Sequence, residues 1–357
     1  MTGARGYSSY RGRGPKWKII LAFLLVIVIT AAVSVIYLGE HMVYSSDGRR
    51  QIVLPWQAEE KNPPPEGEEE PPARPSVDVV VQEPEEPEPE ELRGVSLPAE
   101  ALSQAAWAEF AASLGEHNAV AVRLKTSNGT VYFESAGAVP GAVEVAKEPG
   151  DTAAALSRIT SREGLHAIAS MACLQDFKAA RADVEGRGLK NTGGYIFYDG
   201  NNSLWLDPAK PSAREYVCAL AKEIAELGFD ELLLTDFGYP TEGKINKINY
   251  NTDVPLADNL DLLLSELGAV LEPYGVLLSV EVPEAVISGG ADTVSGLDLN
   301  RLVNRVDRIY AVTTPEKAES LSGLVSQAAG PDGRTEFIPE LAADSPAPAG
   351  SRLILAE

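Results

Sequence analysis

The sequence predicts a (β/α)8 barrel of the TIM type across residues 93–357. Short β-branched runs alternate there with amphipathic helical runs, and this alternation indicates βαβ units around a parallel sheet. The region holds eight candidate strands, the number that closes a barrel, and its length is close to the roughly 250 residues that such a barrel takes. An open doubly wound sheet is the alternative. Its dinucleotide-binding version requires a Gly-rich turn after the first strand, and this sequence has none there.

The strands are predicted from β-branched and apolar runs of four to eight residues, and the helices from apolar residues at three- and four-residue steps. The predicted strands are 93–97, 119–125, 165–171, 231–236, 276–282, 308–313, 335–338 and 352–356. The helical patterns are 101–114, 152–163, 213–227, 256–271, 299–303 and 316–328. Glu357 follows the eighth strand directly, so we expect either a barrel without its last helix or another segment that covers the gap.

The N-terminal part of the sequence predicts a membrane anchor. Residues 1–18 form a basic tail without acidic residues, and residues 19–38 are an uninterrupted apolar run of 20 residues. That run matches the ~20 residues that cross a bilayer as a helix, and the basic flank predicts a cytoplasmic N-terminus. A cleaved signal peptide is the alternative, although its apolar region is usually only ~7–15 residues long. We therefore expect a single-pass protein of the cell membrane with an extracytoplasmic barrel.

A juxtamembrane segment, 39–56, leads to a linker, 57–92, that consists mostly of Pro and Glu. Such a composition cannot bury enough apolar surface to order itself, so we predict a disordered, semi-rigid spacer. The formal net charge of −22 argues against nucleic acid as a partner. Cys173 and Cys218 form no metal motif and the histidines show no ligand spacing, so we predict no metal and no cofactor. Whether the two cysteines are bonded stays open.

Segment 204–240 carries the residues most indicative of function. It begins within a long loop, 173–211, that precedes the helix at 213–227, and connections of that length often carry binding or catalytic residues. We predict that Trp205, Asp207 and Tyr239 contact the substrate, because aromatic rings and carboxylates suit sugars. The alternative for Asp207 is a turn that leads into the next helix, and the alternative for the aromatic residues is an ordinary core position.

Three carboxylates are predicted at the C-terminal ends of barrel strands, where barrel enzymes hold their chemistry: Asp236, Glu281 and Glu340. Period-two alternation would place Asp236 on the inner face together with Leu232 and Leu234. Hydrolysis of a glycosidic bond requires two carboxyl groups, one to protonate the leaving oxygen and one to attack or to activate water. Asp236, Glu281 and Glu340 are therefore the predicted catalytic residues. The alternative is that they cap helices or form ion pairs.

The motif W-L-D-P-x-x-P at 205–211, followed by A-K-E-I-A-E-L-G-F-D-E at 221–231, resembles a bacterial family of glycoside-hydrolase-like domains with amylase-like (β/α)8 barrels. Weaker similarity extends from about residue 94 to 315. The resemblance implies a barrel that hydrolyses O-glycosyl bonds in a polysaccharide. Amylase-type barrels place their acids after strands four and five, and another glycosidase clan uses strands four and seven. Glu281 and Glu340 therefore both remain partners for Asp236.

The sequence departs from the family pattern at the end of the fourth strand. Thr235 stands where relatives have an acid, Asp236 is displaced by one position, and Gly238 replaces an arginine. A one-residue shift turns a side chain to the opposite face, unless a small bulge restores it. Glu281 still matches the family's acid on the fifth strand.

Three functions fit these observations. The first is a membrane-anchored glycosidase acting on cell-envelope polysaccharide. The second is a degenerate barrel that binds glycan or supports envelope assembly without turnover, and the third is a membrane-tethered scaffold that recruits proteins.

Overall fold

The computed structural model describes residues 42–44, 50–52, 91–97, 102–135, 144–145, 149–250, 253–346 and 350–355. The chain divides into two units, 1–85 and 86–357. In the first, β1 (Met42–Tyr44) pairs antiparallel with β2 (Arg50–Ile52). The predicted tail 1–18 and membrane helix 19–38 lie outside the described residues, as does the predicted linker 57–92 apart from its last two residues. Among the helices that are described, none combines the length and apolarity needed to cross a bilayer.

Eight parallel strands of the described chain close a barrel in the second unit, and β16 pairs back to β3. Around the barrel they are β3 (Arg93–Leu97), β4 (Ala119–Lys125), β7 (His166–Ala172), β9 (Glu231–Thr235), β11 (Leu277–Glu281), β14 (Arg308–Val312), β15 (Glu336–Ala342) and β16 (Arg352–Leu355). Each predicted strand overlaps one of these, so the predicted eight-stranded barrel is confirmed. The largest difference is β15, which continues to Ala342 instead of ending at 338.

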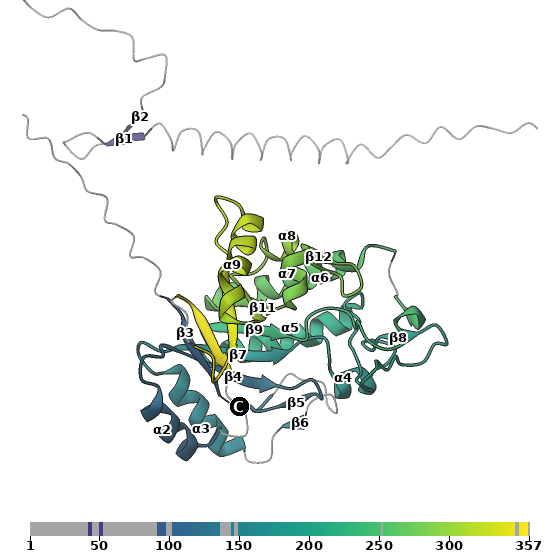
Figure 1. The fold of residues 1–357 in the computed structure, drawn as a ribbon, viewed down its shortest axis with the longest axis horizontal. Coiled ribbons are helices and arrows are strands. Elements are labelled where there is room, and N and C mark those ends of the chain that lie inside the picture. Colours follow the sequence, from purple (N-terminus) through teal and green to yellow (C-terminus); the bar gives the residue numbers. More distant parts are fainter. Residues whose placement is uncertain are drawn as a thin grey trace, which may run out of the picture. The chain divides into compact units, whose positions relative to one another are not determined.

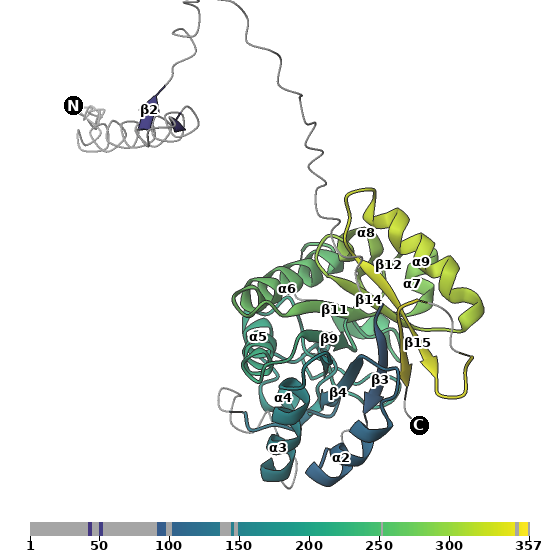
Figure 2. The ribbon, with the colours of Figure 1, turned by 90° about the vertical axis from the view of Figure 1, so that its left-hand side faces the viewer.

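Helices lie outside the ring of strands, as Figure 2 shows. They are α2 (Gln104–Ser113), α3 (Pro149–Thr160), α5 (Pro211–Glu226), α6 (Leu256–Leu271), α7 (Glu284–Gly289), α8 (Leu299–Leu302) and α9 (Pro315–Ala329). Helix α5 begins at a proline, whose fixed φ suits the first helical turn, and is followed by Gly228 at φ +87°. Between β15 and β16, the described residues 343–346 and 350–351 contain no helix.

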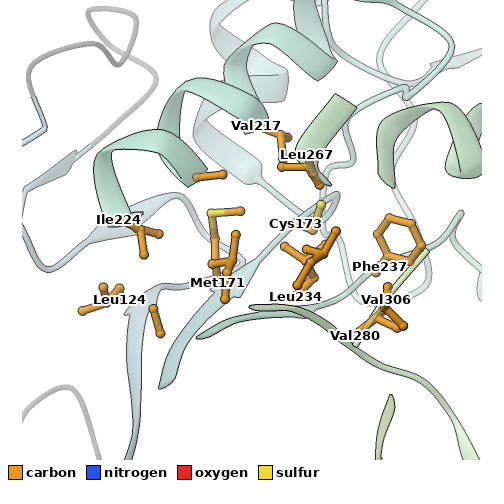
Figure 3. Close-up of a cluster of buried hydrophobic side chains, with 14 of the residues drawn as sticks. Leu124, Met171, Cys173, Val217, Ile224, Leu234, Phe237, Leu267, Val280 and Val306 are labelled. Atoms are coloured by element: carbon orange, nitrogen blue, oxygen red, sulfur yellow. The ribbon is translucent and has the colours of Figure 1, made fainter. Parts of the chain in front are cut away.

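The core consists of two layers separated by the strands. The outer layer packs strands against helices: Met171, Leu234 and Val280 from the strands, with Val217 of α5 and Leu267 of α6 (Figure 3). The inner layer fills the barrel itself and consists of Leu92, Ala119, Ala121, Ile168, Leu233, Tyr310, Ile338 and Leu353. The barrel is therefore filled by side chains along its axis.

The predicted inner face of the fourth strand is wrong. Leu233 belongs to the inner cluster, whereas Leu232 and Leu234 belong to the outer one. Regular alternation from Leu233 makes Thr235, and not Asp236, the inward position at the end of β9. The error has a physical cause. A parallel barrel strand is buried on both faces, so the apolar run Leu232–Leu233–Leu234 does not reveal which face is inside.

A polar network occupies the N-terminal end of the barrel. Glu231 accepts hydrogen bonds from the Tyr310 hydroxyl at 2.8 Å and from Arg308 Nη1 at 2.5 Å, and His166 Nε2 lies 2.7 Å from it. The Glu231 side chain has no exposed area, and that of Arg308 is 16% exposed. Burial acts to raise the pKa of Glu231, but the His166 hydrogen bond and the charge of Arg308 outweigh it, so this pKa lies below its ordinary value.

We predict that Glu231→Gln lowers the free energy of unfolding by about 3–5 kcal/mol, because it leaves the Arg308 guanidinium without its buried counter-charge. Urea denaturation at neutral pH measures this loss. Glu336→Gln is the matched control: its carboxylate contacts the same arginine at 3.0 Å but is 41% exposed, so we expect a loss within about 1 kcal/mol.

The same pair of variants has a defined pH dependence. The pKa of Glu231 is lower in the folded state than in the unfolded state. The stability that its carboxylate contributes is therefore fully present above the unfolded-state pKa and is lost as the pH falls through the folded-state pKa. The difference between wild type and Glu231→Gln should therefore narrow in acid. Equal destabilisation by Glu231→Gln and Glu336→Gln would contradict this assignment.

Candidate active site

A pocket of about 240 Å³ opens at the C-terminal end of the barrel. Its walls come from the loops after β7, β9 and β11 and from the end of β14. The lining residues are Trp205, Asp236, Phe237, Gly238, Tyr239, Thr241, Glu281, Val282, Pro283, Ser295, Leu297 and Val312. In Figure 1 the arrowheads of β4 and β7 point towards the loops that carry α4 (Phe177–Ala182) and β8 (Lys190–Asn191). The pocket thus lies at the end where barrel enzymes hold their catalytic groups.

Asp236 reaches this pocket through an unusual backbone conformation. The pairing of β9 with β7 and β11 runs without a register shift, so no bulge precedes Asp236. Instead, Asp236 has φ +49°, in the left-handed region, and Gly238 follows at φ +136°. This conformation costs a non-glycine residue on the order of 1 kcal/mol and is frequent at functional sites. The left-handed backbone at Asp236, and not a bulge, therefore brings this side chain to the pocket.

The three predicted acids come together at increasing depth. The Asp236 side chain is exposed at the pocket surface, Glu281 is half-buried, and Glu340 is only 3% exposed. Asp236 follows β9, which pairs with β11, the strand of Glu281. One strand, β14, separates β11 from β15, which carries Glu340. Inward alternation along β15 places Glu340 on the same face as Ile338, inside the barrel.

The environment raises the pKa of all three carboxyl groups. Partial removal from solvent raises the pKa of Asp236, and the charges of Lys125 and Arg123 offset part of this rise. Burial raises the pKa of Glu281, and the charge of Asp236 raises it further. Burial, together with the charge of Glu281, raises the pKa of Glu340 to about 8, so Glu340 keeps its proton at neutral pH.

The three acids lack side-chain partners among the described residues. Within the part of the chain that the structure describes, none of the three carboxyl groups makes a hydrogen bond or an ion pair with another side chain. Glu281 and Glu340 retain some contact with solvent, because their oxygens are not among the fully buried polar atoms that lack a hydrogen-bond partner. Neighbouring acids with raised pKa values and free lone pairs are typical of a site that binds or transforms a ligand.

Two cations that the sequence analysis did not single out complete the site. Arg123 and Lys125 flank a register shift near the end of β4. Arg123 is exposed, and its charge lowers the pKa of Asp236, Glu281 and Glu340 alike. The available signal was a pair of basic residues at the end of an otherwise apolar strand, Ala119–Lys125.

Lys125 is buried and anchors the loop beneath the pocket. Its ammonium donates to the Ala172 carbonyl at 2.6 Å and pairs with Asp176 at 2.9 Å. Asp176 also caps α4 by accepting from the Ala179 backbone at 2.8 Å, and it accepts from the Tyr216 hydroxyl at 2.9 Å. These contacts join β4, the start of the long loop, and α5.

The predicted substrate-binding residues differ in position. Trp205 is half-buried and lines the pocket, and its Nε1 donates to Asp199 Oδ2 at 2.9 Å. Tyr239 also lines the pocket, and its hydroxyl accepts from Asn259 Nδ2 at 3.2 Å. Asp207 is completely buried, and its Oδ1 accepts from the Ala209 backbone at 3.1 Å. Asp207 thus holds the position of the turn residue that leads into α5 and, unlike Trp205 and Tyr239, is not among the residues that line the pocket.

The cysteines near the site are free thiols. Cys173 is buried and Cys218 is partly buried. Burial raises the pKa of both thiols, that of Cys218 to about 11, so neither is a thiolate at neutral pH. Among the described residues, no group of three or more His, Cys, Asp or Glu side chains has an arrangement that could hold a metal ion.

We predict that Glu281→Gln lowers the pKa of Glu340 from about 8, because it removes the negative charge beside that carboxyl group. Titration of the glutamate carboxyl carbons by NMR measures the change. Glu284→Gln is the control, since Glu284 pairs with Lys317 at 2.8 Å and does not act on Glu340. An unchanged Glu340 titration in Glu281→Gln would show that the two groups do not interact.

Comparisons with known proteins agree with the barrel. The PgaB (BpsB) glycoside hydrolase domain from Bordetella bronchiseptica is 14% identical, with a TM-score of 0.54 over 75% of this chain and 94% of that chain. A hypothetical protein from Ruminiclostridium thermocellum is 24% identical, with a TM-score of 0.45 over 52% of this chain and 96% of the other. A chitinase from Chromobacterium violaceum is 15% identical, with a TM-score of 0.40 over 71% and 69%.

At these identities the Bordetella domain supports the fold alone, and the two likenesses with lower TM-scores add no argument. A comparison with curated proteins found no match. The sequence profile of one family, described as "Putative glycosyl hydrolase domain", matches residues 107–327. This match spans most of the barrel, from α2 to α9, and includes β9, the pocket loops and Glu281. The chain therefore belongs to that glycosyl hydrolase domain family.

Proposed function

We propose that this protein is a membrane-anchored glycoside hydrolase whose barrel lies outside the cytoplasm and acts on a cell-envelope polysaccharide. The observation that carries the proposal is that Asp236 and Glu281 line one pocket, while Glu340 lies close enough behind them for the charge of Glu281 to raise its pKa. Membership in a glycosyl hydrolase domain family supports a glycan as the substrate class. The apolar run 19–38 supports the anchor, and the Pro/Glu-rich linker 57–92 would give the barrel reach from the bilayer.

Asp236 and Glu281 are the proposed catalytic pair, because both line the pocket. Burial raises the pKa of Asp236, but two cations, Lys125 and Arg123, act against that rise, so we assign to Asp236 the ionised role of nucleophile or of base that activates water. Burial and the charge of Asp236 favour the protonated form of Glu281, which suits the acid that protonates the leaving oxygen. Glu340, deeper and protonated, is the alternative partner for Asp236.

A second candidate function is glycan binding without turnover. Two departures from the family pattern that the sequence resembles favour it: Thr235, and not an acid, holds the inward position at the end of β9, and Gly238 takes the place of the pattern's arginine. A site that has lost the arginine and relies on a left-handed aspartate could still hold a sugar between Trp205 and Tyr239. Turnover separates the two candidates.

We expect the purified full-length protein to release reducing ends from at least one polysaccharide in a panel of cell-envelope glycans. Asp236→Asn and Glu281→Gln should each lower kcat about a hundredfold or more, because positioned acids and bases contribute at least that factor. Glu284→Gln should leave the rate unchanged, since this half-buried carboxylate pairs with Lys317 and does not line the pocket.

Two other outcomes would change the proposed roles. Undiminished activity in Glu281→Gln, with a large loss in Glu340→Gln, would transfer the acid role to Glu340. Retention of a glycan by the wild type without any release of reducing ends would favour the binding function.

The anchor is tested separately. We expect the full-length chain to sediment with membranes and to resist extraction by high salt, because a hydrophobic span is not held by charge. A chain that lacks residues 1–38 should appear in the soluble fraction. Release of the full-length chain by salt would contradict the anchor. Cleavage of the N-terminal segment from the expressed protein would contradict it as well.

A further inference from the structure

We propose that a second glycan-binding surface continues from the pocket along the loop between β7 and α5, made by the rings of Tyr195 and Tyr198. This aromatic rim would hold sugar units of a polysaccharide chain that passes Trp205 and leaves the pocket. The inference rests on the proposed function and deepens it, because it assigns the site to a polymer and not to a single terminal sugar.

The two rings of the aromatic rim are unusually open to solvent. Tyr195 is 76% exposed, more than any other large hydrophobic side chain in the described part of the chain, and Tyr198 is 47% exposed. Between them in sequence, Phe197 is 2% exposed, so the segment is anchored in the core. Exposed aromatic rings on a surface loop can reflect either a binding surface or a loose segment, and the hydrogen bonds around them distinguish the two.

The backbone of Tyr195 is held in a tight turn by hydrogen bonds to Asn191. The Asn191 side-chain oxygen accepts from the backbone of Gly193 at 2.8 Å and of Tyr195 at 3.2 Å, and the Asn191 backbone donates to the Tyr195 carbonyl at 2.7 Å. Strand β8 (Lys190–Asn191) pairs antiparallel with β10 (Ile248–Asn249) from the neighbouring loop. These bonds fix the backbone that carries the ring, and a tyrosine side chain has only two rotatable angles to order when a ligand binds.

Tyr198 precedes a residue that is bonded to the pocket wall. The Asp199 carboxylate accepts from the backbone of Asn201 and of Ser203, both at 2.8 Å, and from Trp205 Nε1 at 2.9 Å. The indole N–H is thereby occupied, so Trp205 can offer a ligand its ring surface only. Gly243 from the loop after β9 closes against the same turn, where an added Cβ would lie 2.6 Å from the Gly200 nitrogen.

The aromatic rim lies close to the pocket. The Leu189 backbone donates to the Trp205 carbonyl at 2.8 Å, and the Phe197 backbone donates to the Leu189 carbonyl at 2.8 Å. The segment with Tyr195 and Tyr198 is therefore two extended chains away from Trp205, which is on the order of 10 Å at strand spacing. Figure 1 shows β8 beyond the C-terminal ends of the strands, on the side of the pocket loops. One oligosaccharide strand can span this distance.

The surroundings of the rings favour a glycan over a protein partner. Apart from Ile196 and the buried Phe197, which lie between them, their neighbours in sequence are small or carry amide, hydroxyl and carboxylate groups: Thr192, Gly193, Gly194, Asp199, Gly200, Asn201, Asn202 and Ser203. A stable protein interface needs about 800 Å² per partner with an apolar centre, and two separate rings do not provide one. A sugar ring presents apolar C–H faces, which stack on aromatic rings, and hydroxyl edges, which bond to amides.

Affinity electrophoresis tests the surface. The full-length protein in detergent is run in native gels that contain glycol chitin, laminarin, xylan or polygalacturonate, beside gels without polysaccharide. We expect retardation by at least one of the four. Tyr195→Ala and Tyr198→Ala should each weaken the apparent affinity about fivefold, and the double variant more than tenfold, as expected for the loss of stacked rings.

Two control variants isolate the cause. Tyr274→Ala removes a ring that is 40% exposed and lies at the end of η4 (Glu272–Tyr274), after α6, so it should leave retardation unchanged. Tyr195→Phe keeps the stacking ring and should bind as the wild type does. Retardation by none of the four polysaccharides, or equal retardation of wild type and double variant, would overturn the proposal.

The same assay separates this proposal from the proposed function. Glu281→Gln should still be retarded although it has lost hydrolysis, because the aromatic rim does not depend on the catalytic pair. Polymer hydrolysis that is unchanged in the Tyr195→Ala/Tyr198→Ala variant would overturn the aromatic rim and leave the catalytic proposal standing. Retardation that depends on both rings, without hydrolysis in any variant, would support the aromatic rim and contradict catalysis.

Discussion

The buried ion pair between Lys125 and Asp176 is the contact on which the candidate site depends. The two side chains are 1% and 0% exposed and lie 2.9 Å apart. Such a pair is stable only when its remaining donors and acceptors are also satisfied, and here Ala172, Ala179 and Tyr216 satisfy them. The pair fixes the end of β4 against the start of the loop that later carries Trp205. The charge of Lys125 also lowers the pKa of Asp236. The residue that supports the pocket therefore also influences the protonation of one of its carboxyl groups.

The two ends of the barrel use carboxylates in opposite ways. At the N-terminal end, Glu231 is fully bonded to Arg308 and Tyr310, and its pKa is lowered. At the C-terminal end, Glu281 and Glu340 have no such partners within the described residues, and their pKa values are raised. The network at the N-terminal end contributes to stability, whereas the acids at the C-terminal end have oxygens that remain available to a ligand. This asymmetry is expected of a barrel whose chemistry lies at one end.

The end of β9 shows how a fold can tolerate a displaced residue. Regular alternation gives the inward position to Thr235, yet Asp236 still lines the pocket because its backbone turns into the left-handed region. Among L-residues, aspartate and asparagine adopt this conformation most readily, so the displacement was compatible with an acid. The site therefore keeps an acid after the fourth strand in a geometry of its own. Its proposed partner, Glu281, occupies a regular inward position.

The sequence by itself determined the eight strands, the approximate extent of α5 and the strand position of Glu281, whereas it placed Glu340 just past a strand that continues to Ala342. These features have local causes: period-two alternation, a proline at a helix start and a glycine after its end. The tertiary structure alone decided the inner face of β9, the burial of Asp207 and the roles of Arg123, Lys125 and Asp176. A parallel strand is apolar on both faces, so its pattern cannot show which face points inward. Pairs such as Lys125 and Asp176 meet only once the barrel closes, and no local pattern records a contact between distant segments.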